Sequence, residues 1–149
     1  MRVLLAIDDS AGSHAAVNAV IAQFRRDGTE VRVLNAIEWP PELSASLVFT
    51  PGAISAGPVM DLREEARGQS QERLARAAQQ LRAAGFSASY EMREGDAGHV
   101  ILECAADWRP DVIVVGSHGR TGLDRVLLGS VSEHVVRHAA CSVAVIRGV

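Results

Sequence analysis

The chain has 149 residues, a length typical of one domain, with 48% hydrophobic and 22% charged residues, as in an ordinary globular protein. Its formal net charge of −3 argues against general nucleic-acid binding, and no apolar run is long enough to predict a membrane span. All 15 basic residues are arginine, and the absence of lysine excludes a Walker A phosphate loop and lysine-nucleophile chemistry.

The N-terminal half alternates between strand and helix signals. Residues 2–7 form an apolar run that predicts a strand, and residues 12–26 have the periodicity of an amphipathic helix. Residues 30–37 alternate and are rich in β-branched side chains, so they predict a second strand. The segment 39–58 has no clear period and contains several prolines and glycines, so we expect a long mobile loop that could close over a ligand.

The C-terminal half continues the alternation. It begins with a long Ala-, Arg- and Glu-rich helical segment that is closed by Gly85. The predicted elements are a helix over 59–84, a strand over 86–92, a helix over 97–108, a strand over 111–115, a helix over 130–139 and a strand over 142–146.

This alternation predicts an α/β fold in which one domain, residues 1–149, forms an open five-stranded parallel sheet with helices on both faces. We expect the Rossmann-like strand order 3-2-1-4-5, which makes strands one and four neighbours. Ligands of such sheets bind beyond the carboxyl ends of the strands, at the point where the strand order reverses. The turn at Asp8 and the loop at Gly116 should therefore face one another.

The stretch from residue 116 to residue 132 carries the chemistry. Gly116, Gly119 and Gly129 lie between a buried strand and a helix start that contains Ser130 and Ser132. Glycines allow an anion to approach backbone N–H groups, and the helix N-terminus adds a favourable dipole. A simpler reading is a tight connection in which one of the two serines caps the helix.

The chain resembles the universal stress protein family, within its ATP-binding subgroup. The resemblance is carried by a glycine motif that consists of Gly116-x-x-Gly119, nine further residues and then Gly129-Ser130. The resemblance implies an adenine slot at the ends of strands one and two, and a phosphate cradle at the start of the last helix. The residues that it implies as binding positions are Ile7, Asp8, Ala36, Val115, Gly116, Gly119, Gly129, Ser130, Val131 and Ser132.

The apolar N-terminal run is interrupted by Asp8-Asp9 too early to predict a signal peptide, so we expect a cytoplasmic protein. The resemblance implies that the protein binds ATP, with Asp8 near the ribose or near a Mg or Mn ion. It implies a nucleotide-dependent sensor or regulator in a stress response, with no obvious catalytic residue. It also implies a homodimer formed through the last strand, residues 142–146, whose apolar edge favours pairing with a second copy.

Two other functions remain open from the residues. The chain could be a slow ATP hydrolase or nucleotidyl transferase with His118 as acid or base, or an interaction module whose glycine loop stays empty. Asp8-Asp9 argues only weakly for a phospho-accepting receiver domain, because that site needs a lysine. His134 and His138 have a zinc-compatible spacing without an evident third ligand, and Cys104 and Cys141 are expected to be reduced.

Overall fold

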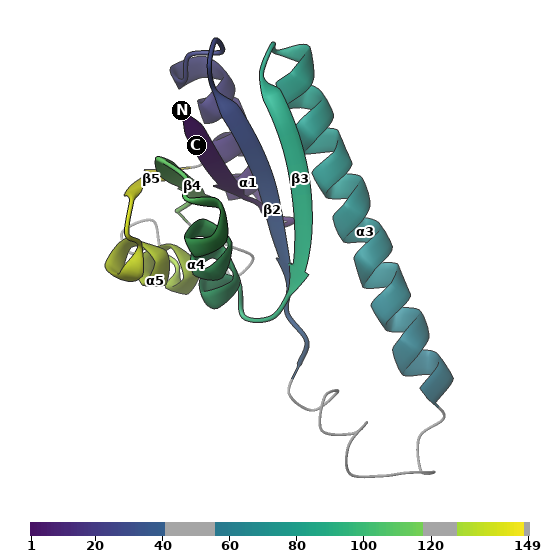
Figure 1. Ribbon diagram of the computed structural model, residues 1–149. Helices are drawn as coiled ribbons and strands as arrows, with labels where there is room; N and C mark the ends of the chain where they lie inside the picture. Colours follow the sequence, from purple (N-terminus) through teal and green to yellow (C-terminus); the bar gives the residue numbers. More distant parts are fainter. Residues whose placement is uncertain (41–55, 118–127, 148–149) are drawn as a thin grey trace.

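The computed structural model describes residues 1–40, 56–117 and 128–147, apart from the side chains of 56–58. Five parallel strands form one sheet in the order β3-β2-β1-β4-β5, which confirms the predicted order (Figure 1). The strands are β1 (Arg2–Ala6), β2 (Glu30–Ile37), β3 (Ser87–Glu94), β4 (Val112–Gly116) and β5 (Ser142–Ile146).

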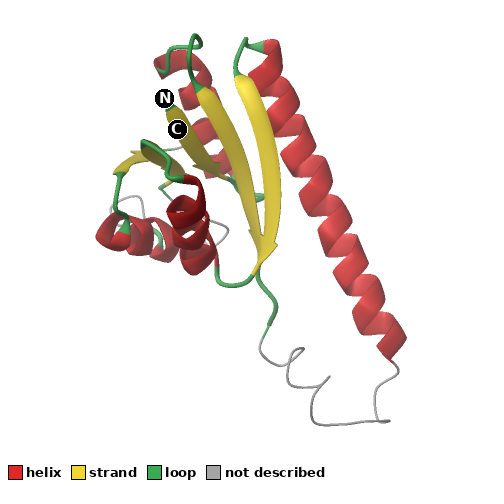
Figure 2. Ribbon diagram, in the orientation of Figure 1, coloured by secondary structure: helices red, strands yellow, loops and turns green. Residues whose placement is uncertain are grey.

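Helices cover both faces of this sheet, as predicted (Figure 2). The helices α1 (Ala11–Gln23) and α3 (Ala56–Ala83) pack on one face, and α4 (Ala97–Trp108) and α5 (Ser130–His138) pack on the other. Successive strand residues point to opposite faces, so Val3 and Leu5 join the first core while Leu4 joins the second. Each such fully buried side chain contributes about 1.5–3 kcal/mol of hydrophobic stabilisation.

Helix α3 begins at Ala56, three residues before the predicted start, so the end of the expected 39–58 loop is helical. Pro58 is compatible with this position because backbone N–H groups in a first helical turn have no intrahelical acceptor. The N-terminal end of α3 extends past the carboxyl ends of β2 and β3 (Figure 1). At the end of β3, Arg67 forms an ion pair with Glu94, and the guanidinium carbon of Arg63 lies 5.1 Å from the centre of the Trp39 ring.

Cys104 and Cys141 are both free, as predicted, and Cys104 is buried. Over the described ranges, none of the helices has the combined length and hydropathy that a bilayer-spanning segment needs.

Candidate functional site

A cavity of about 210 Å³ lies where β1, β2 and β4 end and α5 begins. Nine of the ten predicted binding positions line it, and the tenth, Gly119, lies outside the described residues together with His118. The nine are Ile7, Asp8, Ala36, Val115, Gly116, Gly129, Ser130, Val131 and Ser132. Four chain segments that are far apart in sequence therefore meet at one site.

The turn after β1 forms one side of the cavity and is held by hydrogen bonds. The Ile7 N–H donates to the Leu34 carbonyl at 2.8 Å, which continues the pairing of β1 with β2. The Asp8 Oδ1 atom accepts from the Ser13 hydroxyl at 2.6 Å, and from the backbone N–H and hydroxyl of Ser10 at 3.0 and 2.5 Å. Ser10 is the N-cap residue of α1, but its hydroxyl bonds to Asp8 rather than to the helix backbone. The Asp8 carboxylate thus has a fixed orientation.

The start of α5 forms the opposite side. Gly129 is the N-cap residue and Ser130 is the first helical residue, so the simpler interpretation of a serine cap is wrong. Among the described residues no side chain caps this helix end, which leaves the first-turn N–H groups and the positive end of the dipole for an anion.

The Ser132 hydroxyl differs from its expected role. It donates to the carbonyls of Gly129, at 2.8 Å, and Ser117, at 3.2 Å, and the Ser132 side chain is buried. A hydroxyl has one proton, so in this arrangement Ser132 holds the base of the loop rather than offering a donor to phosphates. The Gly129 N–H also donates to the Ser117 carbonyl at 2.8 Å, which fixes the end of the loop to β4.

Gly116 has a packing reason that the sequence pattern did not reveal. A Cβ atom at this position would lie 3.0 Å from the carbonyl carbon and 3.1 Å from the carbonyl oxygen of Gly12, in the first turn of α1. The sequence pattern explains this glycine by the approach of an anion to backbone N–H groups. The structure shows that a side chain at this position would first collide with the backbone of α1.

The apolar wall of the cavity combines strand and helix residues. Ala36 and Val115 face it from β2 and β4, and Ile101 and Ala97 face it from α4. The sequence did not identify the contribution of α4, nor that of Asn35, which also lines the cavity. Asn35 left a signal, because it is a single amide in the otherwise apolar second half of β2.

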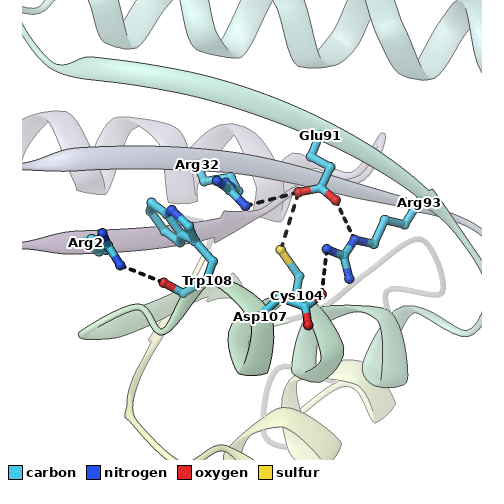
Figure 3. Close-up of polar contacts among 7 residues, drawn as sticks. All are labelled: Arg2, Arg32, Glu91, Arg93, Cys104, Asp107 and Trp108. Atoms are coloured by element: carbon cyan, nitrogen blue, oxygen red, sulfur yellow. Dashed lines mark hydrogen bonds and ion pairs between the residues drawn. The ribbon is translucent and has the colours of Figure 1, made fainter.

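A polar cluster anchors α4 against β2 and β3 (Figure 3). Glu91 accepts hydrogen bonds from Arg32, at 3.3 Å, from Arg93, at 2.6 Å, and from the Cys104 thiol, at 3.8 Å. Burial raises the pKa of Cys104, so the thiol stays protonated and can act as this donor. Arg93 also pairs with Asp107 of α4 at 3.1 Å, so the cluster ties the helix that carries Ile101 to the sheet.

The two histidines of α5 are not part of a metal-binding arrangement among the described residues. The rings of His134 and His138 are 4.4 Å apart, and His99 of α4 adds a third ring 5.1 Å from His134. Within the part of the chain that the structure describes, no group of three or more His, Cys, Asp or Glu side chains is arranged to hold a metal ion.

These features define a doubly wound α/β protein with a ligand cavity at the reversal of strand order. A profile of the universal stress protein family matches residues 1–147, so the chain belongs to the universal stress protein family. Universal stress protein Sll1388 of Synechocystis sp. is 28% identical over 152 residues, which cover 98% of this chain and 97% of that protein. Universal stress protein MJ0531 of Methanocaldococcus jannaschii is 30% identical over 146 residues, which cover 98% of this chain and 81% of that protein.

Solved structures show the same fold. Protein MJ0577 of Methanocaldococcus jannaschii superposes with a TM-score of 0.81 at 25% identity, covering 98% of this chain and 94% of that one. A universal stress protein family member from Arabidopsis thaliana with AMP bound has a TM-score of 0.69 at 20% identity, and the match covers 99% of this chain and 91% of that one. The universal stress protein from Archaeoglobus fulgidus in complex with dAMP has a TM-score of 0.65 at 19% identity, and the match covers 98% of this chain and 97% of that one.

Proposed function

We propose that this chain binds an adenine nucleotide, with ATP as its ligand, and acts as a nucleotide-dependent regulator in a stress response. The observation that carries the proposal is the convergence of nine predicted residues on one cavity at the ends of β1, β2 and β4. The relatives of the fold that hold AMP and dAMP support the choice of an adenine nucleotide.

The two sides of the cavity suit the two ends of a nucleotide. Ala36, Val115 and Ile101 offer an apolar slot for the base, and the start of α5, which no described side chain caps, offers N–H groups to phosphates. The cavity volume of about 210 Å³ is below that of typical ligand cavities, roughly 300–1,000 Å³. It therefore suits the nucleoside, while the phosphates lie at the open mouth over Ser130.

Asp8 is the carboxylate of the β1 turn that would meet a cation carried by ATP. We assign it to Mg or Mn bound together with the phosphates, because its carboxylate is held in place by Ser10 and Ser13. A cation would also offset the repulsion between this carboxylate and the nucleotide. The proposal gives the metal no site that is independent of the nucleotide.

The same proposal includes a cytoplasmic homodimer. Strand β5 lies at the edge of the sheet, and the side chains of Val143, Ala144, Val145 and Ile146 are only partly buried. An apolar edge strand of this kind favours pairing with a second copy across the free edge.

Isothermal titration calorimetry with ATP, AMP and adenosine in the presence of magnesium tests the nucleotide proposal. The Ser130→Asp variant places a carboxylate at an exposed position of the α5 start, where the dipole favours it but phosphates do not. At about 4 Å, two unit charges near a protein surface repel by roughly 4 kcal/mol before screening, so we expect ATP binding to weaken about tenfold or more.

The matched control is Ser87→Asp, the same change at an exposed residue that begins β3 and does not line the cavity. We expect the control to bind ATP as the wild type does, and Ser130→Asp to retain most of its affinity for adenosine. A wild-type protein that releases no binding heat at millimolar ATP would refute the proposal. Equal ATP affinities of the two variants would refute the placement of the phosphates at α5.

A further inference from the structure

Asn35 is a buried amide at the boundary between the nucleotide cavity and helix α3. Its side chain is 4% exposed, and its Nδ2 group donates to the Ile7 carbonyl at 2.6 Å. Ile7 follows the last residue of β1, and its carbonyl belongs to the peptide that leads into Asp8. Asn35 therefore holds the turn that carries two of the proposed binding residues.

Helix α3 holds the other end of the same amide. The hydroxyl of Ser70, which is 1% exposed, donates to Asn35 Oδ1 at 2.5 Å, and Arg73 Nη1 approaches the same oxygen at 3.4 Å. The Ile7 carbonyl can only accept and the Arg73 guanidinium can only donate, so the amino group of Asn35 must face Ile7 and its amide oxygen must face α3. In this orientation the Ser70 hydroxyl donates to the amide oxygen, and Ser70 thus ties to α3 the residue that holds the β1 turn.

We propose that Asn35 is a positioning residue of the nucleotide site and that, through Ser70, it couples the position of α3 to nucleotide affinity. The inference rests on the nucleotide binding proposed above. It extends that proposal by assigning α3, whose N-terminal end extends past the sheet, as the element that responds to the bound nucleotide (Figure 1).

The packing around this link supports a coupling through hydrogen bonds. A second cavity of about 390 Å³ lies between α1 and α3, and it shares Ile7, Asp8 and Ser13 with the nucleotide cavity. Gln69, Glu72 and Arg73 of α3 line the second cavity, so polar side chains of α3 border the space beside the β1 turn. Binding that rigidifies the turn should therefore stabilise α3 at Ser70, and the converse follows from thermodynamic reciprocity.

The test compares three variants. Ser70→Ala removes the donor to Asn35, and alanine is the stronger helix former, which offsets part of the lost stability. Asn35→Asp keeps the shape and the acceptor for α3 but replaces the group that donates to Ile7. The control is Ser89→Ala, because the buried Ser89 hydroxyl has no hydrogen-bond partner among the described residues.

The measurements are ATP affinity by calorimetry and amide hydrogen exchange of α3 with and without ATP. We expect Ser70→Ala and Asn35→Asp to bind ATP about three- to tenfold more weakly than the wild type, and Ser89→Ala to bind within twofold of it. ATP should slow exchange around Ser70 and Arg73 in the wild type and in the control, but not in Ser70→Ala. Melting temperatures without nucleotide establish that each variant is folded.

The outcomes separate this inference from the proposed function. If the wild type binds no nucleotide, the proposed function fails and the inference fails with it. If the wild type binds ATP while Ser70→Ala matches Ser89→Ala in affinity and in α3 protection, the coupling alone is overturned. A Ser70→Ala protein with a lower melting temperature but unchanged affinity would give Ser70 a purely structural role and would overturn the coupling as well.

Discussion

Gly116 offers a clean test of how the site depends on packing, because a single methyl group is the whole perturbation. In Gly116→Ala the new Cβ would lie 3.0 Å from the Gly12 carbonyl carbon and 3.2 Å from its Cα atom. The backbone at Gly116 does not have a positive φ angle, so alanine adds no conformational strain of its own. The cost must come from displacing the first turn of α1 against β4.

Overpacking of this kind costs about 1–3 kcal/mol. For a chain of 149 residues, 1 kcal/mol lowers the melting temperature by about 2–4 °C, so we expect Gly116→Ala to melt about 2–12 °C below the wild type. ATP affinity should fall in parallel, because α1 contributes Ser13 to the cavity and to the Asp8 contacts. Thermal melting by circular dichroism and calorimetric titration measure the two effects.

Gly68 supplies the matched control. It is an exposed residue within α3, and a Cβ atom there would meet nothing within 4 Å. The same glycine-to-alanine change should therefore stabilise the protein by about 0.5–1 kcal/mol through helix propensity. A Gly116→Ala protein that melts at or above the wild-type temperature would refute the steric argument, since it would show that α1 can shift without cost.

Two further predictions concern the sheet edge and the start of α4. The Ile146 carbonyl accepts from the Ser117 N–H, so in this parallel pairing the N–H of the preceding residue, Val145, points to the free edge of the sheet. Val145→Pro removes this donor and should give monomers by light scattering, while the control Val145→Thr should stay dimeric. A monomeric wild-type protein would contradict the proposed dimer. The backbone hydrogen bond from His99 lowers the pKa of the Asp96 carboxyl group below its ordinary value of 3.8. The ionised carboxylate therefore stabilises the folded protein above pH 3.8, and this stabilisation is lost as the pH falls through the lower pKa of the folded state. The control is Asp96→Asn, which keeps the capping oxygen but cannot titrate. When melting temperatures are measured from pH 7 to pH 2.5, the wild type should lose stability relative to this variant. Melting temperatures that fall in parallel for the two proteins would contradict the role of the Asp96 carboxylate.

The five strands could be predicted because their signals are local, although β3 was expected over 86–92 and spans Ser87–Glu94. Strands buried on both faces appear as continuous apolar runs, such as Val112–Val115, and the helices between them repeat with a different period. The facing of the Asp8 turn and the Gly116 loop could be predicted from the strand ends and the glycine pattern, whereas Ile7, Ala36 and Val115 were implied by the family resemblance. In an alternating parallel fold, the ends of neighbouring strands must meet at one edge of the sheet.

What could not be predicted depends on contacts between distant residues. The hydrogen bond between Asn35 and Ser70 joins residues 35 positions apart, and neither residue has a local pattern that names its partner. The contact of Gly116 with Gly12 depends on how closely α1 approaches β4, which is a property of packing. The two hydrogen bonds of the Ser132 hydroxyl depend on where the loop returns to the sheet.

The absence of lysine makes the placement of these elements more important than in a site with an ammonium group. A flexible lysine can follow a phosphate that moves, but the N–H groups of a helix start point in one direction only. The α5 start must therefore be held against β4, by Ser132 and by the Gly129 N–H, before it can bind an anion. For this reason changes that shift a helix, such as Gly116→Ala, should lower stability and affinity together, whereas a charge at Ser130 should lower affinity alone.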